Sequence, residues 1–194
     1  MNERQKEHRE FLKNKILNTA IKLFESGGIE NIKMRKVAGK IKYSATVIYC
    51  YFSNKEELLF EILHSKLNEL VNEMRHIEED DEEKLLREMI NTYVDFFVEN
   101  HEYYYLYTKI NLSKINIDPE QRESLINAPI FPFGRVFDRL VMNGSKKGDY
   151  TNHLYLLWAF MNGLIELKLN RDIGDTVNIE KAIEEFAKYI VSTG

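Results

Sequence analysis

The sequence predicts an all-α protein. Apolar residues recur three or four positions apart along most of the 194 residues, which is the spacing of one buried helix face. No segment sustains the alternation of apolar and polar residues that indicates a β-strand. The three prolines, Pro119, Pro129 and Pro132, lie within one short region, so long stretches on either side are free to form helices.

Three helices are predicted in the first 52 residues, the first of them over 9–26. Their buried stripes are Leu12, Ile16, Ala20 and Leu23 in the first, Met34, Val37, Ala38 and Ile41 in the second, and Ala45, Ile48 and Phe52 in the third. Gly27 and Gly28 supply the left-handed residue that ends the first helix, and Ser44 is the predicted N-cap of the third. The short turn between the last two is typical of a helix-turn-helix.

The chain beyond residue 52 is predicted to be helical as well. Ser53 and Glu56 have the spacing of a capping box and open a long helix, and the acidic run at 78–83 reads as a solvated connection. Pro129 and Pro132 predict that a helix over 119–143 is kinked or split. The other predicted helices cover 84–100, 101–114, 150–170 and 177–192, which gives about nine in all.

Composition excludes several classes of protein. A hydrophobic fraction of 44% is enough for a buried core, and no apolar run reaches the 18 residues of a membrane span. The charged N-terminus lacks the apolar segment of a signal peptide, and a single cysteine, Cys50, fits a reducing compartment, so we expect a cytoplasmic protein. No metal-ligand spacing, nucleophile elbow or phosphate-binding glycine loop occurs, so we expect no metal, no cofactor and no enzymatic activity.

Charge divides the chain into two predicted domains, 1–55 and 56–194. The first carries 12 Lys and Arg against 5 Glu, a net charge of +7, whereas the second carries a net charge of −11. A basic quarter attached to an acidic remainder indicates that one end binds a polyanion, although a solvated surface of uneven charge would show the same asymmetry.

The predicted helix over 44–52 has an outward face suited to the major groove of DNA. Thr46, Tyr49 and Cys50 lie opposite the buried stripe and form a small, nearly uncharged surface. The methyl groups of Thr46 and Val47 can contact thymine, and the Tyr49 hydroxyl can contact a phosphate. Lys55 lies at the positive end of the next helix dipole, where stability alone favours an acid, so a phosphate bound there would explain the lysine.

The order of residues in these helices resembles the DNA-binding region of tetracycline-repressor-type regulators, the TetR family. The resemblance covers about the first third of the chain, through ILNTAIKLFESGG, MRKVAGKIKYS and ATVIYCYFSNKEEL. The matching residues are Leu23, Phe24, Gly28, Val37, Ala38, Ser44, Tyr49, Phe52, Lys55 and Leu58. It implies that Tyr49 and Lys55 contact the phosphate backbone and that residues around Thr46 read bases.

Three positions depart from the family's pattern. Lys42 stands where the turn usually has glycine, Lys33 where a Ser or Thr usually caps the second helix, and Val47 where threonine is common. Lys42 must adopt the backbone conformation that glycine usually adopts in this turn. At position 33, the charge of the lysine can replace the hydrogen bond that a Ser or Thr hydroxyl would make to a DNA phosphate. The predicted DNA-binding residues are Lys33, Lys42, Ala45, Thr46, Val47, Tyr49, Tyr51 and Lys55.

The resemblance also implies that residues 56–194 bind an effector and form a homodimer through the last two helices. The segment 154–169 fits this role, with Leu157, Phe160, Leu164 and Ile165 available for burial and Gly163 permitting close approach of a second backbone. A two-fold dimer places its recognition helices about 34–36 Å apart, which predicts a palindromic operator in double-stranded DNA.

Aromatic residues concentrate in the second predicted domain and suggest an effector pocket. The hypothesis places an apolar or aromatic small molecule among Tyr103, Tyr107, Phe137, Trp158, Met161 and Asn162, with the asparagine as a polar anchor. For any single aromatic residue at helical spacing, burial in an ordinary core is the competing interpretation.

We therefore predict a ligand-responsive DNA-binding transcriptional regulator, a repressor that a small molecule releases from a palindromic operator. Two alternatives from other classes remain open. One is a helical protein-interaction module whose acidic domain is the binding surface. The other is an all-α enzyme without DNA binding.

Overall fold

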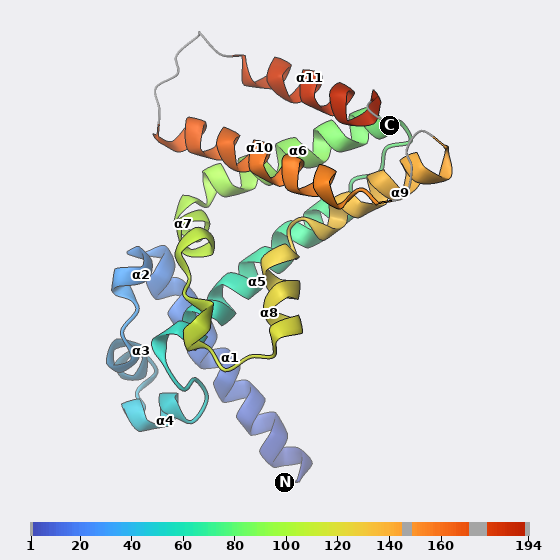
Figure 1. The fold of residues 1–194 in the computed structure, drawn as a ribbon. Helices are drawn as coiled ribbons and strands as arrows, with labels where there is room; N and C mark the ends of the chain where they lie inside the picture. The colour runs from blue at the N-terminus through green and yellow to red at the C-terminus, as the bar shows by residue number, and fades with distance from the viewer. Residues whose placement is uncertain (1, 145–148, 171–177, 193–194) are drawn as a thin grey trace. The chain divides into compact units, whose positions relative to one another are not determined.

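The computed structural model describes residues 2–144, 149–170 and 178–192, apart from the side chains at 119, 121, 125 and 126 (Figure 1). These residues form eleven α-helices, two 3-10 helices and no strand, which confirms the all-α prediction. The chain divides into two compact units: unit 1 comprises residues 1–66 and 102–122, and unit 2 comprises residues 67–101 and 123–194. None of the described helices is long and apolar enough to cross a membrane.

The first four helices belong to unit 1. They are α1 (Glu3–Glu25), α2 (Gly28–Asn31), α3 (Met34–Ile41) and α4 (Ala45–Tyr49). Helix α1 begins earlier than predicted because Asn2 and Gln5 form a capping box, in which the Asn2 side chain accepts a hydrogen bond from the backbone N–H of Gln5 and the Gln5 side chain accepts one from that of Asn2. After α1, Gly28 adopts φ +60°, the left-handed conformation predicted for this glycine pair.

The turn between α3 and α4 depends on Lys42. This residue has φ 62° and ψ 41°, and it is the one non-glycine residue with positive φ in the described part of the chain. The strained turn lets the backbone N–H of Tyr43 donate to the carbonyl of Ala38 at 3.0 Å. Ser44 occupies the predicted cap position before α4, but its side chain makes no capping hydrogen bond, so its contribution is positional.

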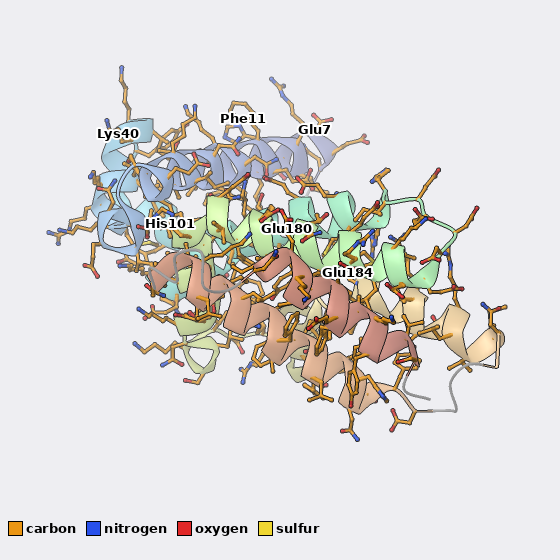
Figure 2. All side chains as sticks on the ribbon, turned by 90° about the horizontal axis from the view of Figure 1, so that it is seen from above. Glu7, Phe11, Lys40, His101, Glu180 and Glu184 are labelled. Carbon is orange, nitrogen blue, oxygen red and sulfur yellow. The ribbon has the colours of Figure 1, made fainter. Side chains whose placement is uncertain are left out.

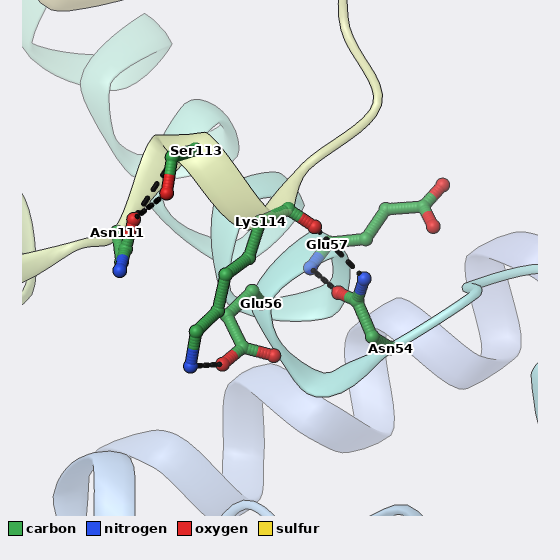
Figure 3. Close-up of polar contacts among 6 residues, drawn as sticks. All are labelled: Asn54, Glu56, Glu57, Asn111, Ser113 and Lys114. Carbon is green, nitrogen blue, oxygen red and sulfur yellow. Dashed lines mark hydrogen bonds and ion pairs between the residues drawn. The ribbon is translucent and has the colours of Figure 1, made fainter.

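Helix α5 (Lys55–Arg75) starts with a cap one residue later than predicted. Asn54, not Ser53, accepts a hydrogen bond through its side chain from the backbone N–H of Glu57, at 2.8 Å. The Glu57 carboxylate accepts the reciprocal bond from the backbone N–H of Ser53, at 2.6 Å. The prediction of a capping box between Ser53 and Glu56 is therefore wrong by one residue. Because Glu56 does not take part in the cap, its carboxylate pairs with the Lys114 ammonium at 3.1 Å (Figure 3). Asn and Ser are equally good caps, so sequence alone does not decide between adjacent positions.

Unit 1 is completed by segments that follow much later in the chain. These are α7 (His101–Lys109), the 3-10 helix η1 (Leu112–Lys114) and the start of α8 (Pro119–Asn127). The Tyr103 ring packs on Phe24 of α1 with centroids 4.7 Å apart. The side-chain N–H of Asn54 donates to the backbone carbonyl of Lys114 at 3.0 Å, so η1 is attached to the start of α5 by two polar contacts (Figure 3).

Unit 2 is organised around α6. Its helices are the remainder of α5 and α8, α6 (Glu82–Glu99), the 3-10 helix η2 (Phe131–Phe133), α9 (Gly134–Met142), α10 (Thr151–Asn170) and α11 (Ile179–Ser192). Met89, Tyr93 and Phe97 of α6 are fully buried, and α6 packs against α9, α10 and α11. The predicted break within 119–143 is confirmed as three separate segments, α8, η2 and α9.

Two arginines of α9 hold the end of α5 in unit 2. The Arg135 guanidinium donates to the backbone carbonyls of Met74, Arg75 and Ile77 at 2.8–3.1 Å, and Arg139 donates to that of Glu79 at 2.7 Å. The carbonyls of Met74 and Arg75 belong to the last turn of α5, where helix carbonyls lack intrahelical donors, and those of Ile77 and Glu79 belong to the segment that follows. Burial, and secondarily the nearby charge of Arg139, lower the pKa of Arg135.

Helix α10 uses most of its predicted interface residues inside the subunit. Leu157, Leu164 and Ile165 are buried in unit 2, and the Phe160 ring stacks on Phe186 of α11 with centroids 3.9 Å apart. Leu157, Leu164 and Ile165 are thus buried within the subunit, where α10 packs on α6, and are not open to a partner subunit as expected; Phe160 stays half-buried. The exposed residues of α10 include four that are apolar, aromatic or small, namely Tyr155, Leu156, Ala159 and Gly163.

Candidate nucleic-acid interface

Helix α4 presents the face that the sequence predicts. Ile48 is fully buried, as is Phe52 just beyond the helix, and they hold α4 against the rest of unit 1. On the opposite side Thr46 and Cys50 are exposed, and Tyr49 is 52% exposed. A short helix held by one buried side and left open on an uncharged, methyl-bearing and hydroxyl-bearing side is shaped to enter a major groove.

The other predicted contacts surround this face. Lys33 lies exposed in extended backbone immediately before α3, and Lys42 lies exposed in the turn before α4. Neither lysine forms an ion pair with an acid in the described residues, so both charges stay available to phosphates. Ala45, Val47 and Tyr51 are half-buried, so part of each side chain remains accessible.

Lys55 is placed differently from a free surface cation. Its ammonium group is half-buried and donates a hydrogen bond to the backbone carbonyl of Ile29 in α2, at 2.8 Å. The lysine therefore lies in the first turn of α5, as predicted, but its partner in this structure is a carbonyl oxygen. That oxygen accepts one of the three N–H donors of the ammonium group, which leaves the other two for a phosphate oxygen.

Two further residues join the interface that the sequence did not indicate. The Lys15 ammonium lies 5.7 Å from the ring centroid of Tyr43, which is 40% exposed and immediately precedes the α4 cap. This cation–π contact brings α1 to the edge of α4. The two residues are 28 positions apart, so no local pattern could have paired them.

The six predicted effector-binding residues fall in both units. Phe137 and Met161 are fully buried in unit 2, where the Phe137 ring stacks on Tyr150 at 5.1 Å. Asn162 donates its side-chain N–H to the carbonyl of Trp158 at 2.7 Å, so this amide group already has a partner within α10. The indole N–H of Trp158 is buried and has no hydrogen-bond acceptor in the described part of the chain.

The remaining two predicted residues, Tyr103 and Tyr107, belong to unit 1. The Tyr103 hydroxyl donates to the Glu25 carboxylate at 3.3 Å, and the Lys66 ammonium lies 5.5 Å from its ring centroid. Tyr103 therefore has packing and polar partners of its own in unit 1. Its burial agrees with the competing interpretation that single aromatic residues belong to a core.

A cavity of about 200 Å³ lies in unit 2 among α8, η2 and α10. It is lined by Glu123, Asn127, Ile130, Phe131, Thr151, Leu154 and Tyr155. None of the six predicted residues lines it. Phe131 and Tyr155 are more than half exposed at the cavity, an unusual position for large rings. Sequence periodicity marks the buried stripes of helices, so it does not find a cavity lined from other faces.

Comparison with known proteins connects this geometry with a family. Residues 16–62, which include α4 and Lys55, match the family model described as bacterial regulatory proteins, tetR family. An HTH-type transcriptional regulator of Staphylococcus aureus is 30% identical over 66 residues, a match that covers 34% of this chain and 36% of that protein. The chain thus matches only about a third of that relative's length.

Solved structures extend the likeness in fold to most of the chain. The regulator FadR of Bacillus subtilis, solved with stearoyl-CoA, is 17% identical with a TM-score of 0.65 over 89% of this chain and 96% of that one. The repressor FadR of Thermus thermophilus, solved with lauroyl-CoA, is 14% identical with the same TM-score over 94% and 95% of the two chains. Through residues 16–62 this chain is therefore similar to the bacterial regulatory proteins of the tetR family, and most of its length shares the fold of these two solved regulators.

Proposed function

We propose that this protein is a homodimeric transcriptional repressor that binds a palindromic DNA operator and is released by a small molecule. One observation carries the proposal: the open, uncharged face of α4 directly follows the exposed Lys42, with the exposed Lys33 just before α3, in the region that matches the tetR family. Neither an enzyme nor a protein-interaction module would need that uncharged face beside exposed cations. In this proposal the protein acts in the cytoplasm, where the operator DNA would be.

In this proposal α4 enters the major groove and the surrounding residues position it. Thr46 and Val47 meet base edges through their methyl groups, with Ala45 beside them. Tyr49 and Tyr51 donate hydroxyl hydrogen bonds to phosphates, while Lys33, Lys42 and Lys55 neutralise phosphate charge. Base contacts supply the sequence preference, whereas phosphate contacts supply most of the affinity and make it sensitive to salt.

The dimer is proposed to form through the outward faces of α10 and α11. Tyr155 and Leu156 are 57% and 54% exposed, and a Cβ atom added to Gly163 would meet no atom within 4 Å in this subunit. A glycine with open space above it lets a second helix approach closely. Two-fold symmetry then places the two α4 helices about one turn of duplex apart, which matches a palindrome.

The effector is proposed to carry a fatty acyl chain. Support comes from the two structural relatives solved with stearoyl-CoA and lauroyl-CoA, whose fold this chain shares. Candidate lining residues are Phe137, Trp158, Met161 and Asn162, all of unit 2. The buried indole N–H of Trp158 lacks an acceptor in the described residues and is suited to donate to a ligand oxygen.

Release would follow from thermodynamic linkage. An effector that binds the DNA-free arrangement more tightly must lower DNA affinity by the same factor by which DNA lowers effector affinity. A tenfold factor in each direction corresponds to about 1.4 kcal/mol of coupling.

Selection from a pool of random duplexes tests the DNA-binding part. The proposal expects a palindromic winner with two half-sites about 10 base pairs apart between centres. A pool that stays random after repeated selection with folded protein, with and without acyl-CoA, would refute it.

A series of acyl-CoA molecules with chains of 8 to 18 carbons tests the effector. Each is titrated into the protein–operator complex while DNA release is followed, and free CoA serves as the matched control. The proposal expects release that depends on chain length and is absent with free CoA. If no acyl-CoA of the series released the DNA, the proposed acyl effector would be excluded, while the proposed DNA binding would stand.

A further inference from the structure

The cavity among α8, η2 and α10 is lined by none of the residues proposed to bind the effector. Its lining comes from two walls, the end of α8 with the start of η2 on one side and the first residues of α10 on the other. The volume of about 200 Å³ is below the roughly 300–1,000 Å³ of pockets for drug-sized ligands. The cavity therefore suits a molecule of about the size of one substituted ring.

The charge at this cavity is negative. Among the described residues, Glu123 of α8 is the one charged residue of the lining, and no Lys, Arg or His takes part in it. Glu123 is exposed and forms no ion pair with another residue of the described chain. Its carboxylate is therefore available to a ligand that carries a positive charge.

The two helix ends at the cavity do not reverse this charge. Helix α8 ends at Asn127, so the negative end of its dipole borders the cavity. Helix α10 begins at Thr151, where the positive end of a dipole would attract an anion. The Asp149 carboxylate already accepts a hydrogen bond from the backbone N–H of Thr151, at 2.8 Å, and offsets that positive end. The local field therefore favours a cation.

Two aromatic rings are open at the same cavity. Phe131 and Tyr155 are 55% and 57% exposed, and neither ring has an aromatic or cationic partner within the residues that the structure describes. The face of an aromatic ring attracts a cation. Ile130 and Leu154 add apolar surface to the lining. Open rings, apolar surface and one carboxylate together suit an ammonium group that carries an apolar substituent.

We propose that this cavity binds a small organic cation, an ammonium group attached to one apolar group. Glu123 would neutralise the positive charge, and the rings of Phe131 and Tyr155 would lie against the ammonium group. Ile130 and Leu154 would cover the apolar part. The cavity would be a second ligand site, because its charge is opposite to that needed by the phosphates of an acyl-CoA. The inference rests neither on DNA binding nor on the acyl effector.

A contact with a second subunit is the competing explanation for the open rings. Tyr155 also belongs to the face of α10 through which the dimer is proposed to form. The experiment therefore changes Glu123 and Phe131 and leaves Tyr155 as it is. Sedimentation of each variant reports any effect on the dimer separately from ligand binding.

Three probes that share one ring and differ in charge test the class of ligand. Benzyltrimethylammonium is the cation, benzyl alcohol the neutral molecule and phenylacetate the anion. Each is titrated into the DNA-free protein in a calorimeter. The cation should bind with a Kd below about 1 mM, and the other two should bind at least tenfold more weakly. No binding of the cation, or equal binding of all three probes, would overturn the proposal.

Matched variants test the residues of the site. Glu123→Gln keeps the shape of the side chain and should weaken cation binding at least fivefold. Glu120→Gln removes the same charge from an exposed position of α8 outside the lining and should leave cation binding unchanged. Phe131→Leu should weaken cation binding at least threefold, because it removes one ring. Phe11→Leu makes the same change at a ring that is 64% exposed and points outward from α1, and it should have no effect (Figure 2).

The variants also separate the cation site from its alternatives. A Phe131→Leu protein with a weaker dimer and unchanged cation affinity would assign the open ring to a subunit contact and overturn the proposal. Cation binding by Glu123→Gln that equals the wild type, or an equal loss in Glu120→Gln, would overturn it as well. Because no DNA is present in these titrations, a failure of operator binding would refute the proposed function without affecting this result.

Discussion

The Lys55 ammonium group donates a hydrogen bond to the backbone carbonyl of Ile29 at 2.8 Å and so ties the start of α5 to α2. A cation in the first turn of a helix is disfavoured by the dipole, and this carbonyl oxygen compensates for that cost in the subunit. A phosphate at the same place would offer the ammonium group a charged acceptor, which forms a stronger hydrogen bond than a neutral one. Lys55 is thus held in place at the start of α5 before DNA arrives.

Replacement of Lys55 by Glu should weaken operator binding at least 100-fold, because it replaces a phosphate contact with a repulsive charge. The free energy of unfolding should change by no more than about 1 kcal/mol, since loss of one hydrogen bond is partly offset by an acid at a helix N-terminus. Lys84→Glu is the matched control, because Lys84 is an exposed lysine in the first turn of α6. Equal DNA binding by the wild type and Lys55→Glu would contradict the assignment.

Lys42→Gly should raise stability and lower DNA affinity together. The left-handed conformation of Lys42 costs a non-glycine residue about 1–2 kcal/mol, of which the greater flexibility of unfolded glycine cancels part, so a gain of about 0.5–1 kcal/mol is expected in urea unfolding. Loss of its exposed charge should reduce operator affinity several-fold. A variant that is less stable than the wild type would show that the lysine side chain stabilises the turn.

Sequence patterns predicted the parts of this fold that depend on neighbouring residues. The predicted buried stripe from Met34 to Ile41 spans α3 as observed, and the helix ends one residue before the left-handed turn at Lys42. The cap of α5 was missed because Ser53 and Asn54 are adjacent and equally capable caps. Local patterns constrain a helix face and a turn closely, but they leave a cap uncertain by one residue.

Contacts between distant segments were beyond the sequence. The partners of Lys55 and Lys15 lie 26 and 28 residues away, and no spacing rule connects them. The predicted boundary after residue 55 stays a prediction about function, while the compact unit that contains α4 also takes in residues 102–122. The open face of α4 was predictable because one helix carries both its buried and its exposed residues.

Gly28→Ala should destabilise unit 1 by about 2 kcal/mol. An added Cβ would lie 2.6 Å from a carboxylate oxygen of Glu102, and alanine at φ +60° is strained regardless of space. The double variant Gly28→Ala with Glu102→Ala separates the two effects in denaturant unfolding, with Glu102→Ala as its reference. The double variant should recover only the part of the lost stability that comes from the clash with the Glu102 side chain. Full recovery would show that the backbone conformation costs nothing.

The Glu56–Lys114 ion pair should make stability depend on pH at the acid end. The hydrogen bond from Lys114, followed by a backbone hydrogen bond, lowers the pKa of Glu56 below its ordinary value of 4.5. The folded state therefore binds the proton less tightly than the unfolded state. The stabilisation is complete above the unfolded pKa and is lost as pH falls through the folded one.

Urea unfolding of the wild type and of Lys114→Met at pH 7 and at pH 3 measures this contribution. The variant should be less stable at pH 7, and the difference should shrink at pH 3 as Glu56 becomes protonated. A difference that is the same at both pH values would assign the effect of Lys114 to packing. Lys181→Met serves as the control, because its pair with Glu185 is largely exposed.

Gly163→Leu should weaken the proposed dimer without unfolding the subunit. The added side chain meets no atom of its own subunit within 4 Å of its Cβ, and leucine favours a helix more than glycine does. Sedimentation of the wild type and variant over a range of concentrations should show a dissociation constant raised at least tenfold for the variant. An unchanged dissociation constant would place the interface elsewhere.

The central claim is that the α4 face reads DNA sequence while the surrounding cations bind its backbone. Its most direct test is the affinity of the wild-type protein for the selected duplex and for a duplex of shuffled sequence, measured from 50 to 200 mM salt. The account predicts at least 10³-fold tighter binding to the selected duplex and a steep loss of affinity with salt on both. Equal affinity for the two duplexes at every salt concentration would contradict it.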